Sequence, residues 1–252
     1  MLKICYNATS FQTFAITTRR ARSIPLASST LIQKMASPLT FKFKDTTNGG
    51  LEVGVDEAGR GCLLGPVYAA AVVWNPDIND GLALKIKDSK KLSPKRREEL
   101  AKYIQENALA YGVGSVDSEE IDRINILNAS KAAMHKALDQ VCEKLASLPH
   151  TPAIQHIAVD GDRFKPYMSP TGDFIPHTSV VEGDNKVSSI AAASILAKVH
   201  RDHWIADLLV REPNMSVYGI KTNQGYGSKA HMDAIKQHGI TPHHRKSYKC
   251  CK

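Results

Sequence analysis

The sequence predicts an α/β domain built on a mixed β-sheet. Two apolar runs rich in β-branched residues come first, at residues 51–56 and 63–74, and helical patterns alternate with short apolar runs after them. Early strands followed by interleaved helices are typical of a sheet with helices packed on its faces. With 252 residues, the chain is long enough for one domain of about 200 residues plus terminal segments.

Residues 1–47 differ from the rest in composition. The first 44 residues contain seven Lys or Arg and no Asp or Glu, and they are rich in Ser and Thr. This composition predicts an organellar transit peptide, with a disordered basic tail as the alternative. We expect delivery to the mitochondrion or chloroplast, or residence in the cytoplasm or nucleus if translation starts at Met35. Most of the net charge of +8 lies in this segment, so the remaining chain is nearly neutral.

The first elements of the domain have recognisable boundary signals. The runs 51–56 and 63–74 predict a β-hairpin at one side of the sheet, and Pro66 indicates a bulge or an edge strand. Ser93 followed by Pro94 predicts a helix that continues to residue 107. Asp117 and Glu120 form a capping-box pattern that starts the next helix.

The later elements alternate between helices and strands. Residues 126–146 carry apolar side chains at helical spacing, which predicts a long helix packed on the core. Residues 154–160 and 177–182 read as strands, and the small side chains of 191–194 allow the helix 187–209 to approach the sheet closely. A short helix at residues 230–238 ends at Gly239.

Carboxylates stand at the ends of the predicted strands. Asp56 and Glu57 follow the first run, and Asp160 and Asp184 follow two later ones. Oxygen ligands of this kind suit Mg²⁺ or Mn²⁺, and a pair of such ions can promote phosphodiester cleavage. Neighbours in a strand point to opposite faces, so we expect Glu57 beyond the strand end or at a bulge.

Asp202 is an alternative to Asp184 as the fourth carboxylate. On one helix, the 18 residues between them would span about 27 Å, too far for both to reach one metal pair. We choose Asp184 because it precedes the periodic helix. Asp202 is expected to pair with a neighbouring base, Arg201 or Lys198.

A glycine-bracketed arginine follows the acid pair. Gly59 and Gly61 have no Cβ, so the backbone around Arg60 can come close to a sugar or phosphate. Adjacent acids after a strand are usually only solvated turn residues, but the glycines and the other carboxylates favour a site.

With these residues, the chain resembles the ribonuclease HII family, the type 2 ribonucleases H. The resemblance spans roughly residues 50–248. In sequence order the matching motifs are Gly54-Val55-Asp56-Glu57-Ala58-Gly59-Arg60-Gly61, Gly65-Pro66-Val67, Asp88-Ser89-Lys90-Lys91-Leu92, Ile124-Asn125-Ile126-Leu127, Val159-Asp160-Gly161, Gly183-Asp184, residues 189–199 with Arg201-Asp202, Gly225-Tyr226-Gly227 and His244-Arg245-Lys246-Ser247.

The resemblance implies a ribonuclease H-like fold, with a five-stranded mixed sheet flanked by helices and a small C-terminal helical extension. Residues 48–212 would be the catalytic domain and residues 213–252 a basic segment that grips the substrate. It implies an endonuclease that cuts the RNA strand of RNA–DNA hybrids and nicks duplex DNA 5′ of embedded ribonucleotides, leaving a 3′-hydroxyl and a 5′-phosphate. Its role would be ribonucleotide removal in DNA replication and repair.

The family's site residues carry over to matching positions of this chain. Asp56, Glu57, Asp160 and Asp184 would hold Mn²⁺ or Mg²⁺ and act in catalysis. The backbone of Gly59, Arg60 and Gly61 would contact the 2′-hydroxyl, which distinguishes RNA from DNA. Tyr226 would stack on the following sugar, and Lys90, with Ser89 as a weaker candidate, would contact phosphate.

Three positions depart from the family pattern. Cys62 stands where proline is usual, which could loosen the loop that holds Arg60. Leu64 replaces a smaller residue, a change in packing that we interpret as neutral. Gln224 replaces a lysine, which removes a phosphate contact. Two alternatives stay open: an inactive hybrid-binding protein, and another ribonuclease H-like nuclease that does not select ribose.

The remaining composition limits the class of protein. Five cysteines without metal-ligand spacing argue against a disulfide framework or a zinc site. His231, His243 and His244 are expected to make structural or substrate contacts. No apolar run approaches the length of a membrane span. We expect a monomer that binds hybrid and ribonucleotide-containing duplex, and we identify no convincing sliding-clamp motif at the C-terminus.

Overall fold

The computed structural model describes residues 39–40, 49–75, 78, 80–87 and 89–251. They belong to one compact unit that spans Pro38–Lys252. Apart from Leu39, Thr40, Gly49 and Gly50, residues 1–50 lie outside the described part, and so does the predicted transit peptide. Thr40 forms an isolated bridge with Val187, and its backbone N–H donates to the Lys186 carbonyl at 2.9 Å.

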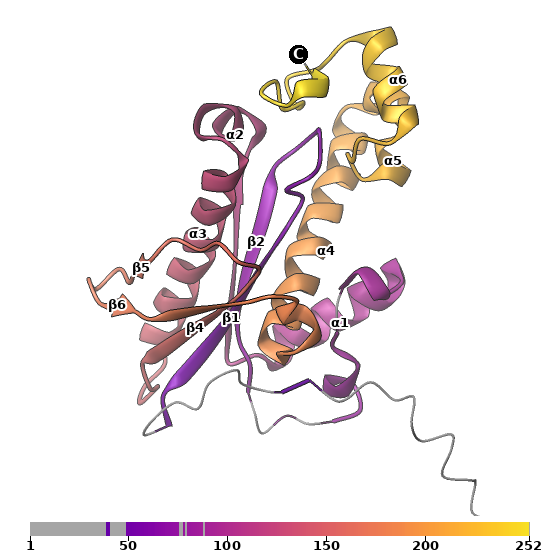
Figure 1. Ribbon diagram of the computed structural model, residues 1–252. Helices are drawn as coiled ribbons and strands as arrows, with labels where there is room; N and C mark the ends of the chain where they lie inside the picture. Colours follow the sequence, from indigo (N-terminus) through magenta and orange to yellow (C-terminus); the bar gives the residue numbers. More distant parts are fainter. Residues whose placement is uncertain (1–38, 41–48, 76–77, 79, 88, 252) are drawn as a thin grey trace, which may run out of the picture. The chain divides into compact units, whose positions relative to one another are not determined.

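A mixed five-stranded sheet forms the centre of this unit, as predicted (Figure 1). The strand order is β3-β2-β1-β4-β7. β1 pairs antiparallel with β2 and parallel with β4; β2–β3 is antiparallel and β4–β7 is parallel. The strands are β1 (Leu51–Ala58), β2 (Val67–Val73), β3 (Ala110–Val116), β4 (Ile154–Asp160) and β7 (His177–Val180), with a separate short pair of β5 (Tyr167–Met168) and β6 (Phe174–Ile175).

The predicted pairing of the first two strands is confirmed, but their place in the sheet is not. β1 lies in the middle of the sheet and β2 lies between β1 and β3, so the predicted position at one side is wrong. Pro66 precedes β2 rather than interrupting it, and residues 63–66 form a loop. A proline just before a strand removes no ladder hydrogen bond, which explains how β2 can be central.

The sequence interpretation missed β3 because two glycines break its apolar pattern. Gly112 and Gly114 lie in this strand, where glycine is intrinsically unfavourable. A Cβ at Gly112 would lie 2.2 Å from the Ala137 carbonyl oxygen, and one at Gly114 would lie 2.2 Å from that of Ala133. The glycines therefore allow the helix that covers this strand to pack against its backbone.

Helices cover both faces of the sheet (Figure 1). The helix α3 packs on one face, against β2 and β3, and α4 packs on the other, against β1 and β2, with α1 beside it. The helices are α1 (Pro94–Asn107), α2 (Ser118–Ile124), α3 (Ile126–Ala146), α4 (Ser188–Arg211), α5 (Ile220–Asn223) and α6 (Lys229–His238). Among these described helices, none is long and apolar enough to cross a membrane.

The predicted helix starts are confirmed by their capping bonds. Ser93 Oγ accepts a hydrogen bond from the Arg96 N–H at 3.3 Å, and Asp117 Oδ1 accepts one from the Glu120 N–H at 2.8 Å. Each bond satisfies a backbone donor in the first turn of its helix.

Small residues position the start of α4 beside the acid pair of β1. Ala191, Ala192 and Ala193 are fully buried against the sheet. A Cβ at Gly54 would lie 2.3 Å from the backbone of Ser189, so strand and helix touch there. The predicted close approach of this helix is confirmed, and it places the first turns of α4 next to Asp56.

The C-terminal residues pack on the far half of α4. Leu208, Met215, Tyr218 and Ala234 form a small apolar cluster with Leu64 of the β1–β2 loop. Backbone bonds join the same parts: Leu63 N–H donates to the Gly225 carbonyl at 2.8 Å, and Gly65 N–H to that of His243 at 2.9 Å. The loop after β1 is therefore held between α4 and the C-terminal segment.

Candidate active site

The acid pair lies near the C-terminal end of the central strand β1. Asp56 and Glu57 are both inside this strand and pair with β2, so the prediction that Glu57 lies beyond the strand or at a bulge is wrong. On the other side, pairing with β4 ends at Val55 and Val159. Because this pairing stops there and β4 ends one residue later at Asp160, the side chain of Glu57 comes close to that of Asp160 although it alternates with Asp56.

Asp160 and Asp184 approach from the next strands. Asp160 is the last residue of β4, and its Oδ1 accepts a hydrogen bond from the Gly183 N–H at 2.7 Å. That bond ties the strand to a 3₁₀ turn, Gly183–Asn185, which carries Asp184 just before α4. Asp184 is only 5% exposed, and its Oδ1 accepts from Asn185 Nδ2 at 2.9 Å. The fold thus brings the four predicted carboxylates into one region.

Burial and neighbouring negative charges raise the pKa values of Asp56 and Glu57. Burial raises the pKa of Asp56 well above its ordinary value, and the negative charges of Glu57, Asp160 and Asp184 raise it further. Burial also raises the pKa of Glu57, while the hydrogen bond and charge of Arg60 lower it. A bound cation would relieve this repulsion, and a donor set made only of carboxylate oxygens fits Mg²⁺ or Mn²⁺.

The carboxylate oxygens are directed to protein donors in the structure. Asp56 Oδ1 accepts from the Glu57 N–H at 2.6 Å, and Glu57 Oε1 accepts from Arg60 Nη1 at 3.1 Å. Among the described residues, no three His, Cys, Asp or Glu side chains surround a common point as metal ligands would. The charge and chemistry of the cluster fit a divalent ion, and the hydrogen bonds described above use one oxygen of each carboxylate.

The loop with Arg60 is fastened by the C-terminal segment. The carbonyl of Arg60 accepts hydrogen bonds from Arg245 Nη1 at 2.9 Å and from the Tyr248 hydroxyl at 2.6 Å. Arg245 is fully buried, and its Nε also donates to the Gly65 carbonyl at 2.9 Å. One arginine therefore holds both ends of the loop that follows the acid pair.

A second buried arginine joins this loop to the one that carries Tyr226. Arg201 is 1% exposed; its Nη1 donates to the Gln224 carbonyl at 2.8 Å and its Nη2 to that of Leu64 at 3.0 Å. A Cβ on Gly59 would lie 2.2 Å from Arg201 Nε, and one on Gly225 would lie 3.1 Å from Nη2. The space beside Gly59 is thus filled by Arg201, a structural reason for glycine that the sequence did not reveal.

Cys62 adds to the contact between the two loops. Its backbone N–H donates to the Gly59 carbonyl at 3.3 Å, a bond that proline could not make. Its Sγ donates to the Gln224 carbonyl at 3.6 Å, and its backbone forms an isolated bridge with Tyr226. Instead of loosening this loop, Cys62 ties it to the Gly225-Tyr226-Gly227 segment.

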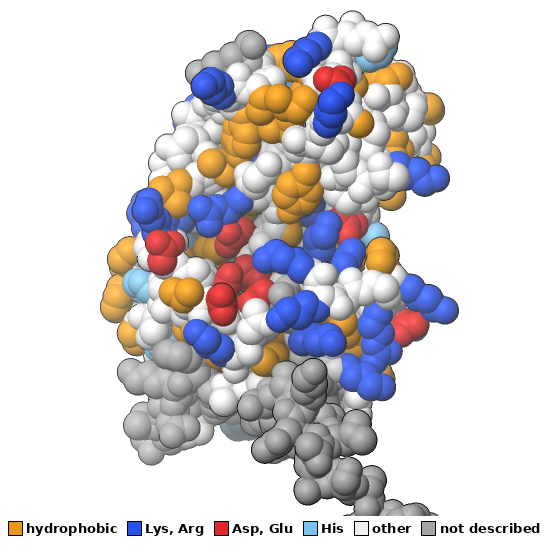
Figure 2. Space-filling view, turned by 45° about the vertical axis from the view of Figure 1, so that its right-hand side comes forward, with side chains coloured by type: hydrophobic (Ala, Val, Ile, Leu, Met, Phe, Trp, Pro, Cys, Tyr) orange, Lys and Arg blue, Asp and Glu red, His pale blue; other side chains and the backbone are white. Residues whose placement is uncertain are grey.

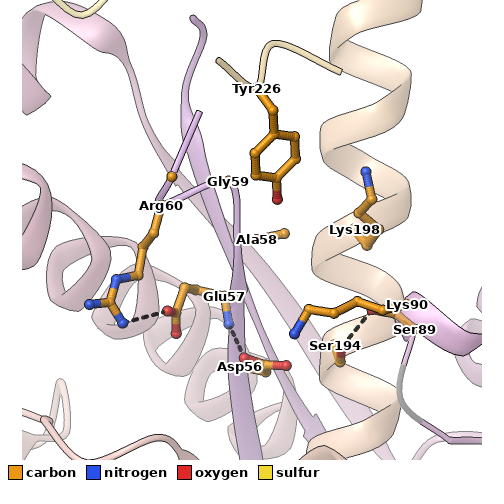
Figure 3. Close-up of a pocket in the computed structure, with 11 residues that line it drawn as sticks. Asp56, Glu57, Ala58, Gly59, Arg60, Ser89, Lys90, Ser194, Lys198 and Tyr226 are labelled. Atoms are coloured by element: carbon orange, nitrogen blue, oxygen red, sulfur yellow. Dashed lines mark hydrogen bonds and ion pairs between the residues drawn. The ribbon is translucent and has the colours of Figure 1, made fainter. Parts of the chain in front are cut away.

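A pocket of about 280 Å³ opens between these loops and α4 (Figure 3). The ring of Tyr226 lies over one side of the pocket (Figure 3), and this residue is 45% exposed. Lys90 extends toward the acid pair from the other side (Figure 3). All five predicted substrate contacts line this pocket. The lining residues are Asp56, Glu57, Ala58, Gly59, Arg60, Gly61, Ser89, Lys90, Ser194, Lys198 and Tyr226.

Sequence reasoning missed two polar residues of α4 that line the pocket. Ser194 and Lys198 are four residues apart and therefore share a helix face. Ser194 Oγ and Ser89 Oγ are hydrogen bonded at 2.8 Å, which fastens the turn bearing Lys90 to α4. That spacing was the available signal, but the sequence prediction for this helix concerned only the close approach of its small residues to the sheet.

The predicted partner of Asp202 is confirmed. Lys198 Nζ contacts Asp202 Oδ1, and Arg97 Nη2 lies 3.5 Å from Oδ2 of the same carboxylate. Asp202 is thus neutralised by bases of α4 and α1, away from the acid cluster. The three histidines expected to make structural or substrate contacts also have protein partners: His243 pairs with Glu212 at 2.9 Å, and His231 and His244 contact each other at 3.1 Å.

Comparison with known proteins agrees with this geometry. A family model described as Ribonuclease HII matches residues 53–251. The chain belongs to the ribonuclease HII family. It is therefore a type 2 ribonuclease H, a metal-dependent hydrolase of nucleic acid. The match covers every element of the site, from the acid pair to the Tyr226 loop.

Individual ribonuclease HII proteins are similar over most of the chain. The Parabacteroides distasonis enzyme is 48% identical over 200 residues, which cover 79% of this chain and 90% of that protein. The enzyme of Phocaeicola vulgatus is 48% identical over 198 residues, 79% of this chain and 89% of that protein.

Solved structures confirm the ribonuclease H-like fold. Ribonuclease H2 of Pyrococcus horikoshii OT3 matches with a TM-score of 0.58 and 28% identity, covering 80% of this chain and 95% of that one. The ribonuclease HII of Archaeoglobus fulgidus, solved in complex with PCNA, matches with a TM-score of 0.59, 27% identity and the same coverages. Bst-RNase HIII, solved with Mn²⁺, shares the fold at 19% identity, with a TM-score of 0.59 and coverages of 81% and 68%.

Basic side chains surround the acidic centre of this ribonuclease HII family member. Figure 2 shows Asp and Glu side chains in the middle of one face, with Lys and Arg side chains around them. Residues 85–97 contribute seven bases to the molecule and residues 221–252 another seven. Such an arrangement suits a polyanion that passes over a negative site, because its phosphates can contact cations on either side.

Proposed function

We propose that this ribonuclease H nicks duplex DNA on the 5′ side of embedded ribonucleotides and cuts the RNA strand of RNA–DNA hybrids. The products would be a 3′-hydroxyl and a 5′-phosphate, and the role would be ribonucleotide removal in DNA replication and repair. One observation carries the proposal. A single pocket is lined by the acid pair, the Gly59-Arg60-Gly61 loop and Tyr226, so cleavage and ribose recognition can occur on the same nucleotide.

Four side chains would hold the metal. We assign this role to Asp56, Glu57, Asp160 and Asp184; burial and the charges of the other three carboxylates raise the pKa of Asp56. Two Mg²⁺ or Mn²⁺ ions, when bound, supply an activated water and stabilise the charge of the transition state. The protein's own contribution is to orient the carboxylates: β1 and β4 hold three of them at adjacent strand ends, and the turn before α4 holds the fourth.

Substrate recognition would use the walls of the pocket. Gly59, Arg60 and Gly61 lie on one side, and we assign their backbone to the 2′-hydroxyl of the ribonucleotide. Tyr226, whose ring is half exposed above the pocket, would stack on the following sugar. Lys90, and with it Lys198 of α4, would contact phosphates, because both amino groups come from the wall opposite Arg60.

We further propose that residues 1–47 deliver the protein to the mitochondrion or chloroplast, and that it acts as a monomer. The support is the absence of acid and the abundance of Arg, Ser and Thr in the first 44 residues. Fluorescent fusions of the full chain and of a chain that begins at Met35 test the first part. Organellar signal that persists in the shorter fusion would contradict it.

The experiment for the activity is cleavage of a labelled DNA duplex with one ribonucleotide by the full chain, with Mg²⁺ or Mn²⁺. We expect a nick directly 5′ of the ribonucleotide, with no cut in an all-DNA duplex. Asp160→Asn should lower the rate at least about 100-fold, because it removes a charged ligand. Asp207→Asn makes the same chemical change at an exposed position of α4 and should cut normally.

Other outcomes would distinguish the alternatives. Equal cleavage of the all-DNA duplex would indicate a ribonuclease H-like nuclease that does not select ribose. Binding of the hybrid without any cut by the unaltered chain would indicate an inactive hybrid-binding protein.

A further inference from the structure

The backbone of Tyr226 is attached to a buried chain of histidine hydrogen bonds. His231 in the first turn of α6 and His244 after this helix are both fully buried. His231 Nε2 and His244 Nε2 lie 3.1 Å apart, and His231 Nδ1 lies 3.0 Å from the Tyr226 carbonyl oxygen. At the other end, the Thr241 N–H donates to His244 Nδ1 at 3.0 Å.

The two ends of this chain determine the position of every proton in it. A backbone N–H can only donate, so Nδ1 of His244 accepts and its Nε2 carries the hydrogen. That hydrogen is donated to His231 Nε2, which must therefore accept. The remaining hydrogen of His231 sits on Nδ1, and it is donated to the carbonyl oxygen of Tyr226. Both imidazoles are neutral, as opposite tautomers.

The surroundings stabilise these neutral forms. Burial lowers the pKa of both histidines. The positive charges that His231 and His243 would carry when protonated lower the pKa of His244 further, to about 4. The Tyr218 ring packs edge-on against both imidazoles, with ring centres 5.9 and 4.8 Å away, and its hydroxyl donates to the Gly239 carbonyl. An additional proton on His231 Nε2 or His244 Nδ1 would point one N–H group at another N–H group. The hydrogen-bond chain therefore excludes a protonated imidazole.

The hydrogen bonds of the histidine pair and of the start of α6 meet at the backbone carbonyl of Tyr226, next to the pocket. The Tyr226 carbonyl also accepts from the Ser228 N–H at 2.8 Å, and Ser228 caps α6 by accepting from the His231 N–H at 3.3 Å. The start of α6, the histidine pair and the Tyr226 peptide group are therefore one hydrogen-bonded unit. The Tyr226 ring lies outside this unit and faces the pocket (Figure 3).

We propose that His231 and His244 are positioning residues for ribonucleotide recognition, which act by holding the Tyr226 backbone so that its ring meets the sugar. The inference rests on the proposed role of Tyr226. Neither histidine lines the pocket, so their effect on cleavage would pass through the Tyr226 carbonyl.

Two substitutions isolate that bond. His231→Leu removes the donor to Tyr226, whereas His231→Asn keeps an N–H close to the position of Nδ1 and loses only the link to His244. On a duplex with one ribonucleotide, we expect kcat/KM to fall about tenfold for His231→Leu, the effect of losing one of the two hydrogen bonds that hold the Tyr226 carbonyl. His231→Asn should recover most of the loss. His203→Asn, which changes an exposed histidine of α4 outside the pocket, is the matched control and should cut normally.

A spectroscopic measurement on the unaltered protein tests the histidine hydrogen-bond chain. It does not depend on whether a variant folds. Proton–nitrogen correlation spectra of the imidazoles of the unaltered protein at neutral pH should show His231 protonated on Nδ1 and His244 protonated on Nε2. Reversed tautomers or charged rings would overturn the proposal. Normal cleavage by His231→Leu, or equal losses in the Leu and Asn variants, would also overturn it. If the unaltered chain fails to cut the ribonucleotide duplex, the proposed function fails instead.

Discussion

At the scale of single residues, the acid cluster places like charges together inside the protein. Asp56 is 6% exposed, and burial together with three neighbouring carboxylates raises its pKa. An ionised carboxylate in this position lowers the stability of the fold at neutral pH. Such local instability is expected where a site is built for a cation rather than for the protein alone.

Asp56→Asn should therefore stabilise the protein when divalent ions are chelated. We expect the free energy of unfolding to rise by about 1 kcal/mol, the size of a typical stabilising substitution. The Asn Oδ1 can still accept the 2.6 Å bond from the Glu57 N–H. Urea unfolding with a chelator measures this change, and Asp207→Asn at an exposed site is the control.

Added Mg²⁺ provides the second half of that test. It should raise the melting temperature of the unaltered chain more than that of Asp56→Asn, because a ligand stabilises the state that binds it. Two outcomes would contradict the assignment of Asp56 as a metal ligand: a lower free energy of unfolding for Asp56→Asn than for the unaltered protein in chelator, or an equal rise in melting temperature of the two proteins with Mg²⁺.

At the scale of elements, the loop after β1 depends on side chains from distant parts of the chain. Arg201 of α4 and Arg245 near the C-terminus donate to carbonyls of this loop. Gly59 allows this because Arg201 occupies the place of its missing Cβ, and its φ of +95° is a conformation that other residues rarely adopt. The loop and α4 therefore form one structural unit.

Gly59→Ala should show how tight this contact is. Gly172, in the turn between β5 and β6, has a similar φ of +89° and nothing within 4 Å of a Cβ. Gly172→Ala should cost about 1 kcal/mol through backbone strain alone. Gly59→Ala should cost about 1–3 kcal/mol more, because the methyl group overlaps Arg201. Equal free energies of unfolding for the two variants would show that Arg201 moves away without cost.

The histidine pair behind Tyr226 should make the fold sensitive to acid. In the unfolded chain His244 binds a proton near pH 6.5, but in the folded protein its pKa is lowered to about 4. Between these values the unfolded state binds more protons, so the free energy of unfolding decreases as the pH falls through this window. From pH 8 to pH 5, His244 alone should account for about 2 kcal/mol of lost stability.

Urea unfolding at several pH values measures this effect. His244→Gln should lose less stability than the unaltered chain between pH 8 and pH 5. His203→Gln, which changes an exposed histidine of α4, should retain the full pH dependence. A pH dependence for His244→Gln as steep as that of the unaltered protein would show that this histidine is not buried in its neutral form.

At the scale of the whole molecule, cations lie around a negative centre (Figure 2). Lys90 and Lys198 line the pocket itself, whereas Lys102 of α1 is exposed, lies outside both basic clusters and pairs with Glu106 at 3.8 Å. In the Asp160→Asn background, which should bind without cutting, affinity for an RNA–DNA hybrid should fall steeply with salt. The reason is that each phosphate contact releases counterions.

Lys90→Ala in that background should reduce the slope of log affinity against log salt by about 1, the value for one phosphate contact. Lys102→Ala should leave the slope unchanged, because this exposed lysine lies outside both basic clusters and does not line the pocket. Binding titrations at four or five salt concentrations measure both slopes. An unchanged slope for Lys90→Ala would remove Lys90 from the phosphate contacts.

The elements with strong local signals could be predicted from the sequence alone. The caps at Ser93 and Asp117 and the apolar spacing of residues 126–146 predicted α1, α2 and α3, because capping and helical periodicity are local properties. The acids at 56, 57, 160 and 184 stood out because they follow strands, and strand ends can meet. The motifs around them predicted the family that the comparisons confirm.

How these parts meet depends on contacts between segments that are distant in the sequence, and local patterns do not predict those contacts. β3 was missed because Gly112 and Gly114 serve the packing of α3, a contact between residues far apart in the sequence. Glu57 lies close to Asp160 because β4 stops beside it, not because β1 ends. Arg201 and the His231–His244 pair hold the pocket loops through long-range bonds to backbone carbonyls. Local patterns determine elements, whereas sites depend on contacts that form only when distant segments are brought together.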